Sequence, residues 1–239
     1  QGDELVRAMA PDIRARVVWF SLDGLEGDGF FLKDGWLVCR GGGVDKSFFP
    51  AEELKIPGRH NIQNSLAASA LAHGQGVPLP VIACALKRFE GVEHRIEPVG
   101  SHRGVRWLND SKGTNPDSTI KAVEAMAGPT VLILGGYDKQ VPFDALADKV
   151  VSSGLVRQAV LLGQSADKID AALRKAGFGQ ITLAASLEDA VCQASVAALP
   201  GDSVLFSPAC ASFDMFNDYE ERGRAFKMLV RALFAAEDS

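Results

Sequence analysis

The feature that most constrains the fold of this sequence is the regular alternation of short apolar runs with helical patterns after His94. The runs with strand character are 105–109, 130–134, 156–162, 181–184 and 203–206. The helical patterns between and after them lie at about 116–126, 143–152, 166–176, 187–198 and 214–236. Alternating strands and helices require right-handed crossovers, which build a mostly parallel sheet with helices on both faces. We therefore expect an α/β protein in which residues 94–239 form a Rossmann-like domain.

Residues 1–93 follow a different pattern. A β-prone run at 17–21 is followed by Asp34-Gly35, which separates two apolar runs at 30–33 and 36–39. This arrangement predicts a hairpin, because a two-residue type I′ turn needs positive φ at both central residues. Two helices are expected next, at about 61–73 and 78–89. We expect this part to be a partial α/β domain.

The charge balance and the apolar runs exclude several classes of protein. The sequence has 25 Lys and Arg residues against 30 Asp and Glu residues, so it lacks the basic surplus of a nucleic-acid-binding protein. Its longest apolar runs, such as 131–134, are far shorter than the roughly 20 residues that cross a bilayer. No secretory signal opens the sequence, and its four cysteines are scattered without a CxxC pair. We expect a cytoplasmic protein with no nucleic-acid or membrane partner, no disulfide framework and no zinc site.

Polar segments directly follow three of the expected strands, at 109–115, 135–139 and 207–213. Ligands of parallel α/β sheets bind at the carboxyl ends of the strands. The first segment holds Asp110 and Lys112, the second holds Lys139, and the third offers Ser212 with free backbone N–H groups near a helix start. Each segment alone could be an ordinary loop with capping residues. Three such loops at one sheet edge favour a site for a phosphate or carboxylate ligand.

Two further places could contact a nucleotide. Asn61 and Asn64 share one face at a helix start, where they could present amides to a base or ribose, or simply cap the helix. Arg95 falls at the expected domain junction, where it could face a phosphate or form a surface ion pair. Neither GxxxxGK(S/T) nor GxGxxG after a strand occurs. The sequence therefore holds only half of a nucleotide site.

Taken in order, five motifs of this sequence resemble those of the Mur ligases. They are HNIQN at 60–64, HRIE at 94–97, NDSKGTNPDS at 109–118, LGGYDK at 134–139 and SPACASFDMFNDYEERGRAF at 207–226. The last motif is similar to that of the members that add D-glutamate, and the resemblance runs from about Val17 to Leu233. It implies that residues 1–93 are the later part of the family's central ATP-binding domain. Residues 94–239 would be its Rossmann-like amino-acid-binding domain.

The resemblance also implies an activity. A Mur ligase of this kind uses ATP to phosphorylate the carboxylate of UDP-N-acetylmuramoyl-L-alanine, and the amine of D-glutamate then attacks the acyl phosphate. ATP and Mg²⁺ are the implied cofactors, the partners are these small molecules, and a monomer is expected. The family's UDP-binding domain, phosphate loop and main Mg²⁺ ligands have no counterpart in this sequence. We therefore expect no metal site in this chain and no turnover by the chain alone.

Individual roles carry over only where a motif matches. The residues implied to contact ATP are Asn61, Asn64, Arg95 and Asp110. Lys112 would hold the reaction centre and, with Asp110, is assigned to catalysis. The residues implied to bind D-glutamate are Thr114, Lys139, Ser212, Phe213 and the backbone of Tyr219. Alternatives are a sister Mur ligase, a folylpolyglutamate synthase, or a non-catalytic Rossmann-type binding module.

Overall fold

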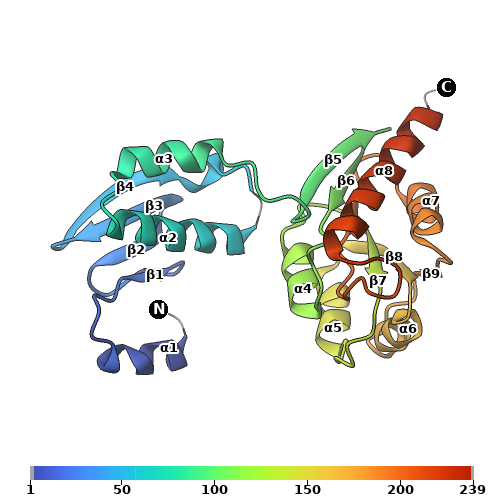
Figure 1. The fold of residues 1–239 in the computed structure, drawn as a ribbon, viewed down its shortest axis with the longest axis horizontal. Coiled ribbons are helices and arrows are strands. Elements are labelled where there is room, and N and C mark those ends of the chain that lie inside the picture. The colour runs from blue at the N-terminus through green and yellow to red at the C-terminus, as the bar shows by residue number, and fades with distance from the viewer. Residues whose placement is uncertain (1–2, 57, 238–239) are drawn as a thin grey trace. The chain divides into compact units, whose positions relative to one another are not determined.

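The computed structural model of the protein describes residues 3–56 and 58–237. The chain divides into two compact units, Gln1–Gly91 and Val92–Ser239, each with its own sheet and helices (Figure 1). The division falls two residues before the boundary expected from the sequence. The prediction of an α/β fold is confirmed.

The second unit is built on a six-stranded sheet with the order β5-β6-β10-β7-β8-β9. Its strands are β5 (Glu97–His102), β6 (Val105–Asn109), β7 (Thr130–Gly135), β8 (Val156–Leu162), β9 (Ile181–Leu183) and β10 (Ser203–Phe206). The helices are α4 (Pro116–Glu124), α5 (Asp144–Ser153), α6 (Ala166–Lys175), α7 (Leu187–Ala197) and α8 (Tyr219–Glu237). All neighbouring strands pair in parallel except β5 and β6, which are antiparallel. The mostly parallel sheet predicted from the alternation is therefore present.

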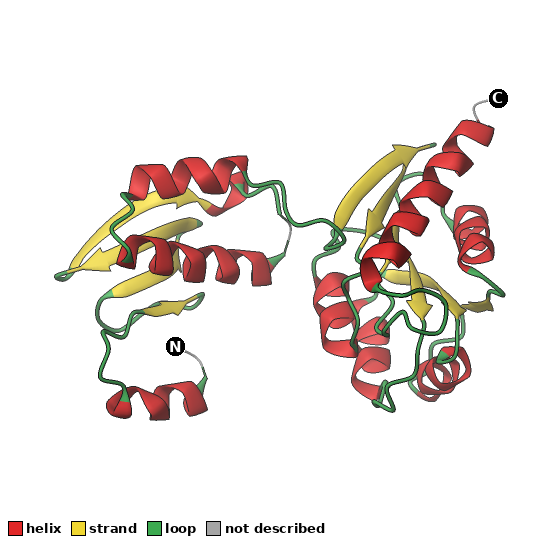
Figure 2. Cartoon of the chain, in the orientation of Figure 1, coloured by secondary structure: helices red, strands yellow, loops and turns green. Residues whose placement is uncertain are grey.

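Helices cover both faces of this sheet, as Figure 2 shows. Every residue of β7 is buried, and successive side chains point to opposite faces. Leu132 and Leu134 join the core cluster that contains side chains of α4, α5 and α6. Val131 and Ile133 join a second cluster, which contains side chains of α7 and α8. The near-continuous apolar character of the strands follows from this double burial.

Two features of the second unit differ from the sequence predictions. Strand β5 was not predicted, because Pro98 and Gly100 weaken its strand pattern; an edge position tolerates both. Its hairpin turn to β6 uses Arg103 and Gly104, with φ of 49° and 77°. The last helix begins at Tyr219, so the prediction that it begins at 214 is wrong. Asp218 accepts a hydrogen bond from the Glu221 amide at 2.6 Å and so fixes the helix start.

The first unit contains a four-stranded sheet with the order β1-β2-β3-β4. The strands are β1 (Trp19–Ser21), β2 (Gly29–Lys33), β3 (Trp36–Gly41) and β4 (Val44–Pro50). The helices are α1 (Glu4–Met9), α2 (Arg59–Gly74) and α3 (Leu79–Arg88), with short 3₁₀ turns at Ala10–Asp12 and Ala51–Glu53. The predicted hairpin turn at Asp34-Gly35 is confirmed, with φ of 50° and 79°. Strand β4 was not predicted; it returns through a second tight turn at Gly42-Gly43.

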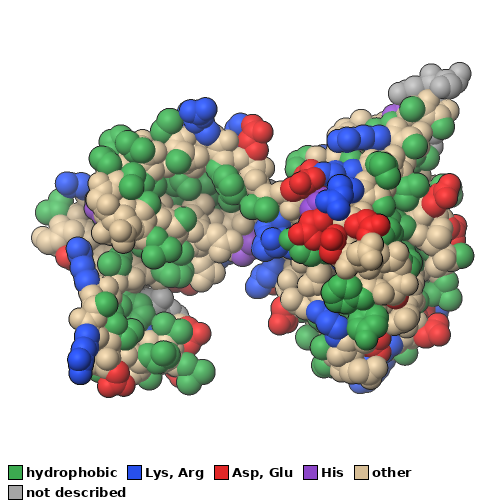
Figure 3. Space-filling model, viewed as in Figure 1, with side chains coloured by type: hydrophobic (Ala, Val, Ile, Leu, Met, Phe, Trp, Pro, Cys, Tyr) green, Lys and Arg blue, Asp and Glu red, His purple; other side chains and the backbone are tan. Residues whose placement is uncertain are grey.

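On the face drawn in Figure 3, acidic and basic side chains are mixed with apolar ones over both units. Within the described residues, no helix combines the length and the apolar character needed to cross a membrane.

The core of the second unit yields a matched test. Leu161 in β8 is fully buried, whereas its cross-strand partner Leu183 in β9 is 56% exposed. Leu161→Ala should lower the free energy of unfolding by about 2–5 kcal/mol, because it leaves a cavity. Leu183→Ala should change it by about 0.5 kcal/mol or less. Urea unfolding of both variants measures the difference, and equal losses would contradict the burial described here.

Candidate functional site

Three loops meet at one edge of the second unit's sheet. They follow β6, β10 and β7, which are neighbours in the strand order and parallel to one another. Their carboxyl ends therefore lie side by side. The topology brings together the three polar segments that the sequence places after these strands.

The loops after β7 and β10 are joined through their backbones. The Gly135 amide donates to the Pro208 carbonyl at 2.8 Å, and the Tyr137 amide donates to the Ala211 carbonyl at 2.9 Å. Gly136, at φ 142°, has no room for a side chain, because a Cβ there would collide with the Ala211 carbonyl oxygen. Lys139 follows Tyr137 by two residues and Ser212 follows Ala211 directly. The pairing therefore brings the segments of Lys139 and Ser212 together.

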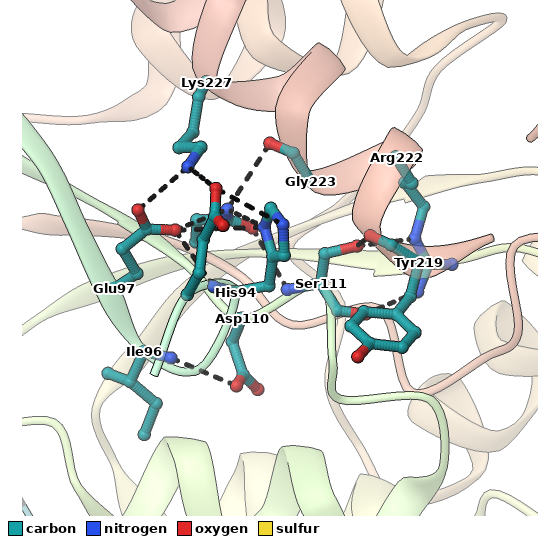
Figure 4. Close-up of polar contacts among 11 residues, drawn as sticks. His94, Ile96, Glu97, Asp110, Ser111, Tyr219, Arg222, Gly223 and Lys227 are labelled. Carbon is teal, nitrogen blue, oxygen red and sulfur yellow. Dashed lines mark hydrogen bonds and ion pairs between the residues drawn. The ribbon is translucent and has the colours of Figure 1, made fainter. Parts of the chain in front are cut away.

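The Arg222 side chain ties the loops after β6 and β10 to helix α8. It is only 1% exposed. Its Nε donates to Ser111 Oγ at 3.0 Å and one Nη donates to the Ser111 carbonyl at 2.8 Å (Figure 4). The other Nη donates to the carbonyls of Cys210 and Ala211, both at 3.0 Å. Burial lowers the pKa of Arg222 to about 10, so the guanidinium stays charged at neutral pH.

The Asp110 side chain connects the loop after β6 to two other segments through hydrogen bonds. The side chain is buried: one oxygen accepts from the Ile96 amide at 3.2 Å and the other accepts from Ser207 Oγ at 2.6 Å. Burial raises the pKa of this carboxyl to about 6, although both hydrogen bonds act to lower it. A Cβ on Gly113 would lie 2.6 Å from the carboxylate, so the turn requires glycine. The expected contact of Asp110 with a nucleotide stays a prediction.

A second polar network anchors the segment that leads into β5. The side-chain amide of Asn109 contacts His94 Nδ1 at 2.9 Å and Glu97 at 3.1 Å, and its carbonyl accepts from the Ser111 amide at 3.1 Å. Lys227 Nζ lies 2.6 Å from Glu93 and 2.9 Å from Glu97. Burial lowers the pKa of His94, which favours the neutral ring. Figure 4 shows this network beside the Arg222 contacts, so both reach the same loop.

The cationic side chains expected to act on substrates lie at different depths. Lys112 is half-buried, with Nζ 5.3 Å from the centre of the Tyr219 ring. Lys139 is exposed, and its ammonium has no partner among the described residues. Arg95 is exposed on the segment before β5, and its charge helps to lower the pKa of Asp110. All three belong to the second unit.

The hydroxyl and aromatic candidates line the loops around these cations. Thr114 is half-buried in a tight turn, where its amide donates to the Lys112 carbonyl at 2.9 Å. Ser212 is 2% exposed. Phe213 is 67% exposed and packs edge-on against Tyr137, with the ring centres 6.1 Å apart. The Tyr219 carbonyl accepts from Ser111 Oγ at 2.8 Å, which leaves its N–H, at the first residue of α8, as the backbone group that could meet a ligand.

Asn61 and Asn64 lie in the other unit, in the first turns of α2. Asn61 is buried, and Asn64 donates to its side-chain oxygen at 3.3 Å. The helix thus brings this pair together, as the spacing predicts. The expected contact with ATP stays a prediction.

The sequence analysis assigned no role to Arg222 or Lys227, and it noted Asn109 and Ser111 only as members of the polar segment 109–115. For Arg222 a signal exists: it stands four residues before Phe226 and eight before Val230, both buried in α8. A charged residue on the buried face of a helix must find hydrogen-bond acceptors inside the fold. One partner, Ser111, is 111 positions away in the sequence, and the contact leaves no local pattern.

The comparisons agree with this geometry. Residues 94–210 match the family model described as "Mur ligase, glutamate ligase domain". Residues 94–210 thus belong to the Mur ligase family. The UDP-N-acetylmuramoylalanine–D-glutamate ligase of Thermoanaerobacter sp. (strain X514) is 46% identical over 233 residues, which is 97% of this chain and 51% of the relative. The enzyme of the same name from Symbiobacterium thermophilum is 45% identical, with the same coverage. The chain thus spans about half the length of the curated relatives it matches.

Solved Mur ligase structures share the fold. The MurF ligase from Thermotoga maritima in complex with ADP has a TM-score of 0.65 at 13% identity, covering 99% of this chain and 53% of that one. A UDP-N-acetylmuramate-alanine ligase from the same organism has a TM-score of 0.63 at 18% identity, covering 90% and 48%.

The buried carboxyl of Asp110 predicts a specific pH dependence. Its pKa is about 6 in the folded chain, against the ordinary 3.8. The protonated group therefore stabilises the fold below pH 4, and this contribution is lost as the pH rises through 6. Two pKa units correspond to roughly 3 kcal/mol. Asp110→Asn should remove this decline.

Urea unfolding between pH 4 and 7.5 measures the effect as the difference between wild type and variant. Asp117→Asn, on the exposed first turn of α4, is the matched control and should keep the wild-type profile. A decline that persists in Asp110→Asn would mean that another group causes it.

Proposed function

We propose that this chain is the later part of the central ATP-binding domain and the amino-acid-binding domain of an ATP-dependent ligase. The ligase adds D-glutamate to UDP-N-acetylmuramoyl-L-alanine during the synthesis of peptidoglycan precursors, and so serves cell-wall biogenesis, cell shape and cell division. The observation that carries the proposal is the backbone pairing of Tyr137 with Ala211, which sets the segments of Lys139 and Ser212 side by side.

A dicarboxylic amino acid requires two anion sites on a rigid scaffold. Lys139, in the loop after β7, offers an unpaired ammonium. The Thr114 hydroxyl lies in the loop after β6, which β10 separates from β7 in the sheet. The Ser212 hydroxyl and the Tyr219 amide at the start of α8 offer a second site, because a helix start favours negative charge. Phe213 and Tyr137 supply an apolar wall for the methylenes between the carboxylates.

The names of the relatives support D-glutamate over the amino acids of the sister ligases. Relatives at 45–46% identity are named for D-glutamate, whereas the two sister-type structures described above are 13% and 18% identical. The motif at 207–226 lies within this similarity. A sister ligase or a folylpolyglutamate synthase is therefore the weaker alternative. A non-catalytic binding module would not need the complete set of substrate-side loops.

The proposed reaction has two steps. The γ-phosphoryl group of ATP passes to the substrate carboxylate, giving an acyl phosphate and ADP. The amine of D-glutamate then attacks the acyl carbon and loses a proton, and the tetrahedral intermediate expels inorganic phosphate. Asn61, Asn64 and Arg95 would bind ATP, and Asp110 would orient the loop that meets the nucleotide. Lys112 would stabilise the negative charge at the reacting phosphate.

The residues described here do not fit Mg²⁺. Within the described residues, one group of His and carboxylate side chains has metal-like spacing, formed by Glu93, His94 and Glu97. Lys227 pairs with both carboxylates, and Asn109 engages His94 Nδ1. Mg²⁺ requires oxygen ligands in near-octahedral geometry, which this paired cluster does not offer. This cluster is therefore not a Mg²⁺ site of the proposed reaction.

The proposal extends to a monomeric, cytoplasmic enzyme whose partners are ATP, D-glutamate and UDP-N-acetylmuramoyl-L-alanine. The scattered free cysteines suit a reducing compartment. The mixed surface charge suits small-molecule substrates better than nucleic acid.

Lys139→Ala tests the amino-acid site in the full-length ligase. Hydrogen bonds to charged groups contribute roughly 1.5–3 kcal/mol, so the KM for D-glutamate should rise by roughly 10- to 100-fold. The KM for ATP should change little. Lys121→Ala removes an exposed lysine that pairs with Glu124 and serves as the control. Steady-state kinetics with each substrate varied separate these outcomes. A rise in the KM for ATP alone would contradict the assignment of Lys139.

The chain alone should fold without turnover. It lacks a triphosphate-binding loop, so incubation with ATP, Mg²⁺, D-glutamate and UDP-N-acetylmuramoyl-L-alanine should release no phosphate above a protein-free control. The full-length ligase should release phosphate only when all three substrates are present. Steady release by the 239-residue chain would contradict this expectation.

A further inference from the structure

The Asp214 carboxylate ties the site to a fourth loop. Asp214 follows Phe213 in the segment between β10 and α8. One of its oxygens accepts from the Gln164 amide at 3.2 Å. Gln164 lies in the turn between β8 and α6, and β8 is the neighbour of β7 in the sheet. The segment that carries Ser212 and Phe213 is thus attached to a loop that holds none of the substrate residues named so far.

The turn between β8 and α6 is shaped for this contact. Gly163, at φ 75°, would place a Cβ against the Asp214 carboxylate and 2.9 Å from the Cα of Gly136. Only glycine lets the carboxylate and the β7 loop approach the turn so closely. A Cβ at 163 would displace one or both of them.

Ser165, at the start of α6, contributes to the same junction instead of capping its own helix. Its hydroxyl donates to the Gly136 carbonyl at 2.6 Å and accepts from Cys210 Sγ at 3.2 Å. The turn therefore contacts the loop after β7 and the loop after β10 at once. Asp214 supplies the acidic side chain that accepts a hydrogen bond from the Gln164 N–H in this turn.

The position of Asp214 is not explained by stability alone. Its other carboxylate oxygen is buried and has no hydrogen-bond partner in the described part of the chain. An unpaired buried oxygen costs free energy, and such groups in a native fold call for a further reason. A role in holding the neighbouring residues of the site supplies that reason.

We propose that Asp214 is a positioning residue for the D-glutamate site. It holds the 212–217 segment against the turn between β8 and α6, so that the Ser212 hydroxyl and the Phe213 ring keep their places without Asp214 touching the substrate. This inference rests on the proposed function.

The chain offers a matched control in Asp189. Its carboxylate accepts from the Ala185 amide at 2.9 Å just before α7, which is the same chemistry at another helix start. Helix α7 carries none of the site residues. A general loss of helix capping would affect both aspartates alike, whereas a positioning role belongs to Asp214 alone.

The kinetic test compares Asp214→Ala, Asp214→Asn and Asp189→Ala in the full-length ligase. Asp214→Ala should raise the KM for D-glutamate by about fivefold to twentyfold, with the KM for ATP within about twofold of wild type. Asp214→Asn should restore most of the loss, because its amide oxygen can still accept from Gln164. Asp189→Ala should leave both constants unchanged. An unchanged KM for D-glutamate in Asp214→Ala, or an equal rise in Asp189→Ala, overturns the proposal.

Hydrogen exchange of the 239-residue chain gives a readout that does not depend on the substrate. Amides 211–217 should exchange faster in Asp214→Ala and in Gly163→Ala, and at the wild-type rate in Asp189→Ala. If the wild-type ligase did not use D-glutamate, the proposed function would fail while this comparison still decided whether Asp214 holds the segment. Unchanged exchange in both Asp214→Ala and Gly163→Ala overturns the inference itself.

Discussion

The site depends on one buried cation, the guanidinium of Arg222. Its four hydrogen bonds to described residues all go to neutral oxygens of Ser111, Cys210 and Ala211. A buried charge held this way costs desolvation energy that no ion pair returns. In exchange, helix α8 fixes the loops after β6 and β10 in one arrangement. The positive charge also contacts the segment that carries Ser212, through the carbonyls of Cys210 and Ala211.

Close approach of the loops explains glycines that a sequence reader would assign only to turns. Gly113, Gly136 and Gly163 each lack room for a Cβ. The obstacles are the Asp110 carboxylate, the Ala211 carbonyl and the Asp214 carboxylate respectively. Gly136 and Gly163 thus mark points where two loops touch. Gly113 meets Asp110 of its own loop, and its Cβ would also lie 2.8 Å from Ser207 Oγ in the loop after β10. Two of these glycines belong to the motifs quoted above: Gly113 follows Lys112, and Gly136 is the second residue of the Gly-Gly pair that precedes Lys139.

Local patterns were sufficient for most of the fold and for placing the three polar loops at one edge of the sheet. The five parallel strands and the Asp34-Gly35 turn follow from side-chain periodicity and turn chemistry. Strand β5 could not be predicted locally, because Pro98 and Gly100 are acceptable only at a sheet edge. The polar loops were visible, but the contacts of Arg222 and Lys227 were not. The contacts of Arg222 with Ser111 and of Lys227 with Glu93 join residues more than 100 positions apart, so only the folded chain creates them.

Features that cost folding free energy are concentrated at the same edge of the sheet. Among the described non-glycine residues, six have positive φ, and two of them, Asp34 and Arg103, sit in hairpin turns. The other four are His94, Ile96, Gln140 and Ala209, and all lie in segments that border the site loops. The ionisation penalty of Asp110 and the unpaired oxygen of Asp214 belong to this region too. A fold selected for stability alone would not concentrate such costs in one place, so their clustering favours loop geometry as the property that this edge maintains.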